Sequence, residues 1–366
     1  MTVRVTWVRV VMTLLGLIAA GMLVAWSGFV PIAASSGHWK ITDWFLHWTM
    51  RNAVKTQSAL TTPKDVIASQ ELVSAAGHFA QSCASCHGAP GVRPLPVMQA
   101  ATPPAPNLQI NAKQWTDRHL YWILEHGVKF SGMPAWAAKD RPDEIRRMVA
   151  FVRALPGMTP ATYRSLVSGV DAHVPQAALG LAARCTGCHG TDGRGRGQPD
   201  IPVLGQQKPG YLYAALKSYA AGTRSSAIMR QAAATLTEGE MRELATHFAA
   251  QPGLGVRVAN GSIGAQARRI ALEGLPERQL PACLGCHSPA RANPYPVIHG
   301  QRVMYLADRL ERWRGDETIV DARKPHAVMP TIARRVPADM IMPLARYFAA
   351  APADRPKTQA LTGDRR

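Results

Sequence analysis

Cys83-Ala-Ser-Cys86-His87 is the first of three Cys-x-x-Cys-His motifs in this chain of 366 residues. The second is Cys185-Thr-Gly-Cys188-His189 and the third is Cys283-Leu-Gly-Cys286-His287. Together the three motifs contain all six cysteines of the protein. No cysteine of the chain therefore lies outside these motifs.

The chemistry of this spacing indicates covalent haem attachment. Two thiols three residues apart can each add to one vinyl group of a single porphyrin, and the histidine that follows can ligate the iron from below. The other interpretations are a zinc half-site and a thioredoxin-like redox pair, but neither requires a histidine at that position. Zinc would also need its cysteine pairs closer together. The motifs predict three covalently bound haems c, with His87, His189 and His287 as proximal ligands.

The composition is basic, with a formal net charge of +18 and charged residues making up 18% of the chain. The basic residues are scattered, and the sequence has no helix-turn-helix, zinc finger or RNP pattern, so nucleic acid is not expected as a partner. A basic surface that orients acidic redox partners or anionic lipid is the expected role of this charge. The length predicts two or three domains plus additional segments.

An uncharged run of 25 residues, Val10 to Ala34, follows Arg4 and Arg9. As a helix it would be about 37 Å long, enough to cross a hydrocarbon core of about 30 Å. The basic residues before it place the amino terminus in the cytoplasm. A cleaved signal peptide is the alternative, but its apolar region is typically only about 7–15 residues. We expect residues 1–36 to be an uncleaved, single-pass anchor in the bacterial inner membrane, with the haem domains on the periplasmic side.

Three tryptophans follow the apolar run within ten residues: Trp39, Trp44 and Trp48. Trp44 and Trp48 are four residues apart and share one helical face. Tryptophan is enriched at membrane interfaces, so residues 37–68 are expected to form an interfacial amphipathic segment.

The first cysteines of the motifs lie at 83, 185 and 283, which indicates three copies of one module rather than a short-period solenoid. The expected domains are residues 69–158, 172–253 and 262–351, followed by a disordered tail at 352–366. Each module is expected to end in a helix, at 143–155, 238–250 and 338–350, and turn-rich linkers are expected at 156–175 and 252–262. Almost no strand-type alternation is present, so the predicted fold class is all-α.

The sixth iron ligand is expected to be methionine in each module. Met133, Met229 and Met329 follow the proximal histidines by 46, 40 and 42 residues. Methionines commonly fill cores, and Met148, Met241, Met340 and Met342 are interpreted that way. The alternative ligands are spare histidines, each of which is more often a surface or hydrogen-bonded residue. These are His78, His119, His126, His173, His247, His299 and His326.

The two expected iron ligands of each haem indicate whether it transfers electrons or acts as a catalyst. Methionine opposite histidine raises the haem potential relative to two histidines and leaves no iron position for oxygen or peroxide. The prediction is therefore a carrier of one electron per haem and not an enzyme. The alternatives are a multi-haem peroxidase, which needs an iron without its methionine, and a haem-based redox sensor, which needs an output domain.

These residues resemble class I cytochromes c, in which the haem motif stands near the start of the module and the methionine near its end. Modules 2 and 3 together look like the tandem di-haem cytochromes of that class. The one anchor and three haems are similar to the cytochrome subunits of bacterial membrane-bound dehydrogenases. That resemblance implies a dehydrogenase subunit as donor, and quinone, another cytochrome or a terminal oxidase of a respiratory chain as acceptor. Ser288-Pro289 departs from the pattern, because Gly88 and Gly190 follow the other two motifs.

Overall fold

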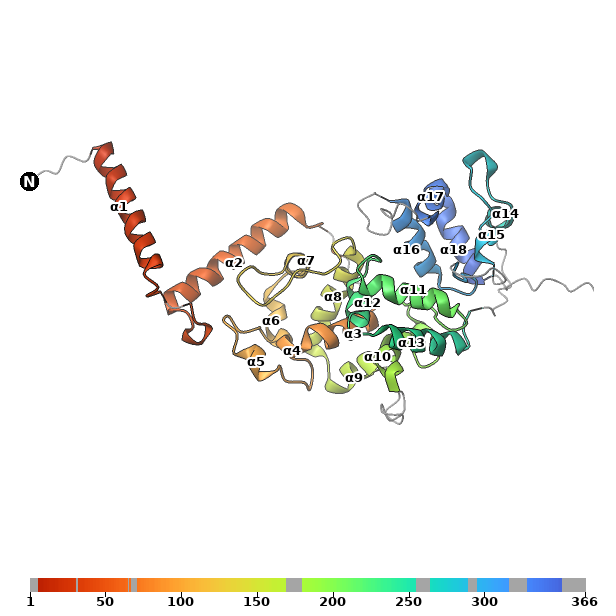
Figure 1. Cartoon of the computed structure of the whole chain (residues 1–366), viewed down its shortest axis with the longest axis horizontal. Coiled ribbons are helices and arrows are strands. Elements are labelled where there is room, and N and C mark those ends of the chain that lie inside the picture. The colour runs from red at the N-terminus through yellow and green to blue at the C-terminus, as the bar shows by residue number, and fades with distance from the viewer. Residues whose placement is uncertain are drawn as a thin grey trace, which may run out of the picture.

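The protein was analysed as a computed structural model that describes residues 6–30, 32–64, 66, 71–168, 180–254, 264–288, 295–315 and 328–350. The predicted all-α class is confirmed: these residues form helices joined by turns, and among them only two isolated bridges, Ala89–Val92 and Leu275–Leu280, resemble strand pairing. The apolar amino-terminal helix lies at one end and the carboxy-terminal helices lie at the other (Figure 1).

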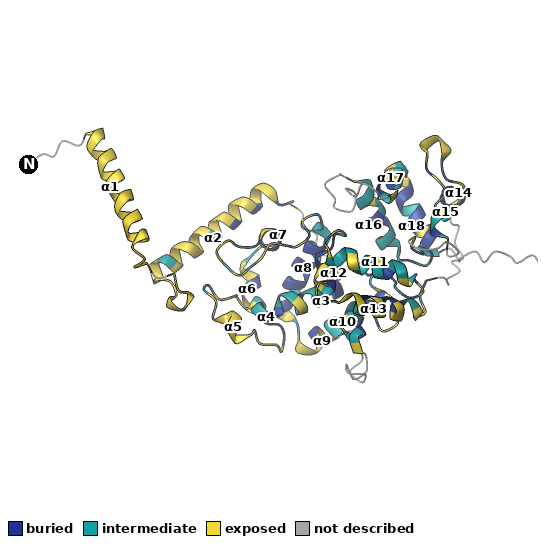
Figure 2. Ribbon diagram, viewed as in Figure 1, coloured by how far each residue is buried: buried dark blue, intermediate teal, exposed yellow. Residues whose placement is uncertain are grey.

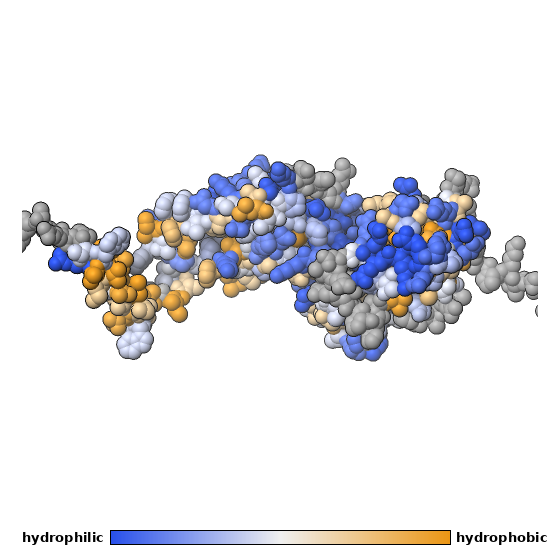
Figure 3. Space-filling view, turned by 90° about the horizontal axis from the view of Figure 1, so that it is seen from above, coloured by the Kyte–Doolittle hydropathy of each residue, from blue (hydrophilic) through white to orange (hydrophobic). Residues whose placement is uncertain are grey.

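The first helix, α1 (Trp7–Trp26), is exposed along its whole length, as Figure 2 shows. Twenty residues span about 30 Å as a helix. The helix ends earlier than the uncharged run because Ser27 and Gly28 follow it, and Gly28 has a φ of +74° that a helix cannot accommodate. In the space-filling view the hydrophobic colour concentrates on this helix, while the opposite end of the molecule is largely hydrophilic (Figure 3).

The second helix, α2 (Lys40–Thr61), connects α1 to the first module. Trp44 and Trp48 stack on one face with ring centroids 6.2 Å apart, and both are exposed. The other end of α2 packs against α7 (Asp117–His126), where the Arg118 side chain donates hydrogen bonds to the Ala59 and Thr62 carbonyls. The far end of α2 is thus fixed to the module, while Trp44 and Trp48 remain exposed.

The first module is built around α3 (Val73–Ser82) and α8 (Pro142–Ala154), whose Phe79 and Phe151 rings lie 5.1 Å apart in its core. One expectation for this region was wrong. Part of the predicted linker 156–175 is a helix, α9 (Pro160–Ser168), because Pro160 suits the first turn and the Thr159 hydroxyl accepts the Thr162 N–H. The short helices of the module are α4 (Ala84–His87), α5 (Pro96–Gln99) and α6 (Leu108–Asn111).

The second and third modules repeat one layout. The second contains α10 (Ala183–His189), α11 (Pro209–Ala220), α12 (Ala227–Ala233) and α13 (Glu238–Ala250). The third contains α14 (Ala265–Glu273), α15 (Leu284–His287), α16 (Val303–Arg314), α17 (Val328–Arg335) and α18 (Ile341–Ala350). Helix α13 has the predicted bounds, since Thr237 and Glu240 form a capping box at its start. The predicted helix 338–350 begins with a 3-10 turn, Ala338–Met340, before α18. The tail 352–366 and most of the linker 252–262 lie outside the described residues.

A shared carboxylate links the first and third modules. Asp143, in the first turn of α8, accepts hydrogen bonds from Arg141 at 3.0 and 2.9 Å and from Arg147 at 2.8 Å. Arg312 of α16 also pairs with it. Burial alone would raise the pKa of Asp143, but the hydrogen bond from Arg141 and the charges of Arg141, Arg312 and Arg147 hold this pKa well below its usual range.

Replacing Asp143 by asparagine should destabilise the contact between these modules. The change removes one carboxylate partner from each of three partly buried arginines, while Arg141 keeps Glu144, Arg147 keeps Asp200 and Arg312 keeps Asp308. The loss should therefore lie below the about 3–5 kcal/mol of a fully broken buried pair. The measurement is urea unfolding of the haem-loaded protein at pH 7, followed by circular dichroism. Glu238→Gln, in an exposed ion pair with Lys217, is the control and should leave the midpoint unchanged.

The sign of the pH dependence follows from the lowered pKa. The Asp143 contribution is fully present above the unfolded-state pKa of about 4 and is lost as the pH falls below that value toward the folded-state pKa. The difference between wild type and Asp143→Asn should therefore stay constant from pH 5 to 8 and shrink below pH 4. A difference that is unchanged at pH 3 would contradict this assignment.

Candidate haem sites

Each Cys-x-x-Cys-His motif forms a short helical segment that ends at or just after its histidine. Helix α3 leads directly into Cys83, and α4 ends at His87. Gly88 then has a φ of +67° and Gly190 a φ of +76°, so both turns use the left-handed conformation that favours glycine. At the third motif, Ser288 instead has an ordinary extended φ of −64°, so the departure noted in the sequence changes the exit from this turn.

The three histidine rings are oriented in the same way. His87 Nδ1 lies 2.8 Å from the Pro106 carbonyl, and His287 Nδ1 lies 2.9 Å from the Pro296 carbonyl. At the second motif the Pro202 carbonyl is the corresponding neighbour of His189, although His189 Nδ1 makes no hydrogen bond of standard geometry. An Nδ1–H donated to a carbonyl leaves the Nε2 lone pair for a metal, which is the usual arrangement of a ligating histidine.

Burial keeps these rings neutral. It lowers the pKa of His87 and His287, and it lowers the pKa of His189 to about 4, with the proline carbonyls opposing the shift in each case. A neutral imidazole at neutral pH is the form that binds iron.

The pKa of the first cysteine in each motif is shifted in the opposite direction from that of redox-active thiols. Burial raises the pKa of Cys83 to about 12 and the pKa of Cys185 and Cys283 to about 11. Redox motifs instead lower the pKa of the attacking thiol, so this environment does not favour the thioredoxin-like interpretation.

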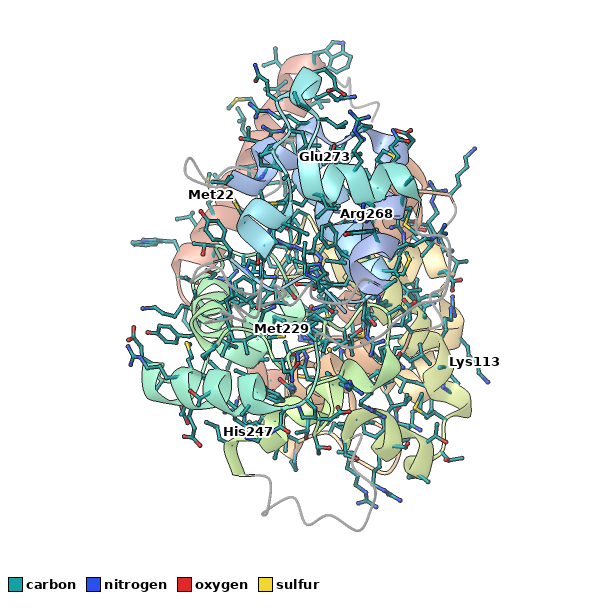
Figure 4. All side chains as sticks on the ribbon, turned by 90° about the vertical axis from the view of Figure 1, so that its right-hand side faces the viewer. Met22, Lys113, Met229, His247, Arg268 and Glu273 are labelled. Atoms are coloured by element: carbon teal, nitrogen blue, oxygen red, sulfur yellow. The ribbon has the colours of Figure 1, made fainter. Side chains whose placement is uncertain are left out.

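One large cavity joins the second and third motifs. Its walls contain Cys185, Cys188, His189 and Met229 of module 2, and Cys283, His287 and Met329 of module 3. The structure therefore brings the expected histidine–methionine pairs of both modules to a single hollow. Figure 4 shows Met229 among helices at the centre of the view, whereas Lys113 and His247 lie toward its edges.

In the first module, Cys83 and Met133 both pack against the same hydrophobic core, which contains Phe79 and Trp136. The Met133 segment is held in place by the Met133 N–H, which is donated to the Ser131 hydroxyl, and by the Met133 carbonyl, which accepts the Val128 N–H. Met133 is half-buried.

Comparisons with known proteins agree with this geometry. The family described as cytochrome C oxidase, cbb3-type, subunit III matches residues 70–152, and the cytochrome c family matches residues 177–248. The thiosulfate dehydrogenase electron acceptor of Stutzerimonas stutzeri is 34% identical over 176 residues, which are 46% of this chain and 79% of that protein. The chain belongs to the class I c-type cytochromes. It is accordingly an electron-transfer cytochrome that carries covalently bound haem c.

Other relatives of this cytochrome include cytochrome c4 of Pseudomonas aeruginosa, which is 31% identical over 36% of this chain and 67% of the relative. Among solved structures, the reduced recombinant cytochrome c4 from Pseudomonas stutzeri is 25% identical. The match has a TM-score of 0.41 and covers 49% of this chain and 98% of that chain.

The residues around the shared cavity fit haem. Its apolar walls and neutral histidines suit a porphyrin and its iron, and the wall also contains a cationic side chain, Arg224, that would pair with a carboxylate of haem. The Arg224 guanidinium donates to the Tyr211 hydroxyl at 3.2 Å and to the Tyr305 hydroxyl at 2.9 Å. Its Nε is buried without a hydrogen-bond partner. A buried donor left in this way calls for a further acceptor, which a haem carboxylate would provide.

A buried carboxylate that the sequence analysis missed positions the methionine helix of module 2. Glu144 of α8 is 1% exposed; its oxygens accept the Ser226 hydroxyl at 2.6 Å and the Ala227 N–H at 2.8 Å. Ser226 in turn caps α12 by accepting the Met229 N–H at 3.1 Å. A carboxylate of module 1 thus supports the start of the helix that carries Met229. Its place in the first turn of an amphipathic helix gave no sequence signal for this role.

Two glutamines at equivalent positions of modules 2 and 3 join these modules reciprocally. Gln207 donates to the Val297 carbonyl at 2.8 Å and accepts the Val297 N–H at 2.9 Å. Gln301 does the same with Val203, at 3.0 and 2.8 Å. The repeat Pro202–Tyr213 and Pro296–Ala307 contained both glutamines at equivalent positions, which was the available signal.

The described spare histidines contact side chains or backbone groups of the protein. His119 completes the capping box of α7, His126 lies beside Trp122, and His299 lies edge-on to Phe348. His78 lies against Trp136 and lines the wall of the shared cavity. His173 and His326 lie outside the described residues.

Replacing Arg224 by leucine should lower the potential of the haem nearest to it, because a cation favours the reduced, less positively charged state. A tenfold effect corresponds to about 60 mV for a one-electron couple, which is the expected upper limit. Potentiometric titration followed by visible absorption measures the shift. Arg224→Lys keeps the charge and should shift the potential less; equal shifts in both variants would contradict the electrostatic role.

Proposed function

We propose that this cytochrome is a membrane-anchored, periplasmic tri-haem protein that relays single electrons. The observation that carries the proposal is the meeting of a motif histidine and its expected methionine at one cavity, as His189 with Met229 and His287 with Met329. Bound haem c supplies reversible one-electron chemistry at iron. A histidine and a methionine of the chain would ligate each iron, so that no position would remain for a substrate.

The proposed attachment residues are the six motif cysteines: Cys83, Cys86, Cys185, Cys188, Cys283 and Cys286. The proposed axial pairs are His87 with Met133, His189 with Met229, and His287 with Met329. The proline carbonyls at 106 and 296 orient the imidazoles, and the caps at Ser131 and Ser226 orient the backbone before two of the methionines. Four of the six proposed ligands are therefore positioned by hydrogen bonds that the chain itself makes.

The donor is proposed to be a periplasmic dehydrogenase subunit. Support comes from two relatives described as thiosulfate dehydrogenase electron acceptors, which are 34% and 30% identical to this chain. The acceptor is proposed to be quinone, another cytochrome or a terminal oxidase. The chain would then act as the cytochrome component of a dehydrogenase complex.

The anchor is proposed to be α1. A helix of this length and composition with no buried residue has no core to join within the described chain. The adjoining exposed Trp44 and Trp48 suit the interface of a bilayer. The haem modules would then lie on the outer side of the inner membrane.

Replacing Met229 by histidine should lower the potential of one haem and leave the other two unchanged, because a second imidazole lowers the potential relative to a thioether. Potentiometric titration gives the potentials, and the ferric thioether-to-iron charge-transfer band should lose about one third of its intensity if three such irons are present. Met241→Leu, at a buried position of α13, is the control and should alter neither reading. A high-spin haem in the wild-type protein would instead favour a peroxidase-type enzyme.

The anchor predicts that the full chain remains with the membrane after washing with high salt and is released by detergent, because helix insertion does not depend on ionic contacts. A chain that begins at Gly37, with a cleavable signal peptide in place of the anchor, should be released without detergent. Sequencing of the mature amino terminus provides the independent test. A terminus near Ser35 would refute the anchor.

A further inference from the structure

The first module covers the haem-attachment helix of the second. Gly187, inside the second motif, is buried, and a Cβ at this position would lie 2.1 Å from the Val167 carbonyl oxygen at the end of α9. Arg196 reinforces this contact by donating to the Leu166 and Gly187 carbonyls at 2.8 and 2.7 Å. A glycine is required here because the backbone of module 1 lies directly against the motif.

Helix α3 covers the neighbouring cysteine. A Cβ at Gly77 would lie 2.7 Å from Cys188 Sγ, and the Val73 carbonyl lies 4.0 Å from the same sulfur. The Ser74 hydroxyl fixes the helix by donating to Asp200 of module 2 at 2.6 Å. Because α3 also leads into Cys83, the same helix connects the first haem-attachment site with the second.

The third motif has the opposite environment. Gly285 occupies the position equivalent to Gly187, is exposed, and would have no described atom within 4 Å of a Cβ. The first motif lies between these extremes, because Ser85 is half-buried and its carbonyl accepts the Leu95 N–H at 2.9 Å. Among the described residues, the third motif is therefore the most open of the three.

The described part of the third module is basic as a whole. In residues 264–288, 295–315 and 328–350 there are ten arginines and no lysine, against five aspartates and glutamates. Arg278 is exposed at the tip of the Leu275–Leu280 turn, just before Cys283, although Glu277 is its neighbour. Arg268 and Glu273 lie on α14 in front in Figure 4, which views the end of the molecule that carries this motif. Helices α14 and α15 lie at the opposite end from α1 (Figure 1).

We propose that module 2 is an internal relay closed by module 1, and that an outside redox protein with an acidic surface docks at the open third motif around Gly285 and Arg278. This inference rests on the proposed electron relay. Electrons then pass through the modules in chain order, and a partner reaches the chain at module 3 and not at module 2. An acidic docking surface complements the arginine excess and accelerates association through charge.

The partner surface is tested by two matched charge reversals. Arg278 precedes the third motif, and Arg184, also exposed, directly precedes the second. Reduction of the oxidised cytochrome by reduced rubredoxin, a small acidic redox protein, is followed by stopped flow at low ionic strength. Arg278→Glu should slow the bimolecular rate by about three- to tenfold, with less effect in high salt, and Arg184→Glu should leave it unchanged. An equal or larger effect of Arg184→Glu, or none of Arg278→Glu, would overturn the docking proposal.

Substitutions of the two equivalent glycines, Gly187 and Gly285, test whether module 1 closes module 2. Gly187→Ala should separate modules 1 and 2, because a backbone carbonyl cannot yield the required space. The expected results are increased hydrogen exchange in α9 and α10 and slower electron transfer between these modules. Gly285→Ala should change neither. If Gly187→Ala does not mature, Gly77→Ala provides the second test at the thioether sulfur. Hydrogen exchange as in wild type in both closure variants would overturn the internal relay.

A haem count by the pyridine haemochrome assay distinguishes a failure of the docking inference from a failure of the proposed electron relay. Three haems per wild-type chain, together with unaffected charge-reversal rates, would refute the docking inference and leave the electron relay intact. Fewer than three haems in the wild-type protein would instead contradict the proposed function.

Discussion

Two adjacent carboxylates at the start of α8 hold the three modules in one arrangement. Asp143 pairs with Arg141 and Arg147 of module 1 and with Arg312 of module 3. Glu144 accepts hydrogen bonds from the start of α12 in module 2. Both groups are well shielded from solvent, and a buried carboxylate is tolerated only when it is paired and hydrogen-bonded. The arginine and backbone partners therefore cannot separate without leaving a buried charge. These contacts help to hold the three modules together.

The repeated modules acquire different roles through their contacts. Modules 2 and 3 meet through the reciprocal Gln207 and Gln301 hydrogen bonds and share a cavity. Module 1 meets module 2 differently, by placing α3 and α9 against the attachment helix α10. The same motif is thus covered in one copy and open in another, although its local sequence barely differs. A glycine that is sterically required at position 187 has no such requirement at position 285.

The arrangement also gives the molecule two distinct ends. The apolar helix α1 and the tryptophan face of α2 lie at one end, and the basic third module lies at the other. Helix α2 is fixed to module 1 through Arg118, so the module nearest the proposed membrane surface is the first. A relay in chain order then runs away from that surface, which is the geometry expected of a protein that joins a membrane to an outside partner.

The sequence by itself determined the family, the all-α class and the cofactor, because Cys-x-x-Cys-His is a local covalent requirement that five residues satisfy alone. It also predicted the helix 238–250, and the methionines from their common offset. It did not predict α9, because proline and threonine mark a turn as readily as the start of a helix. Only the tertiary structure decided that Glu144 supports the Met229 helix, that the matched glutamines join modules, and that Gly187 is covered. Each of these depends on residues twenty or more positions apart, whose meeting is set by packing and charge pairing and leaves no local pattern.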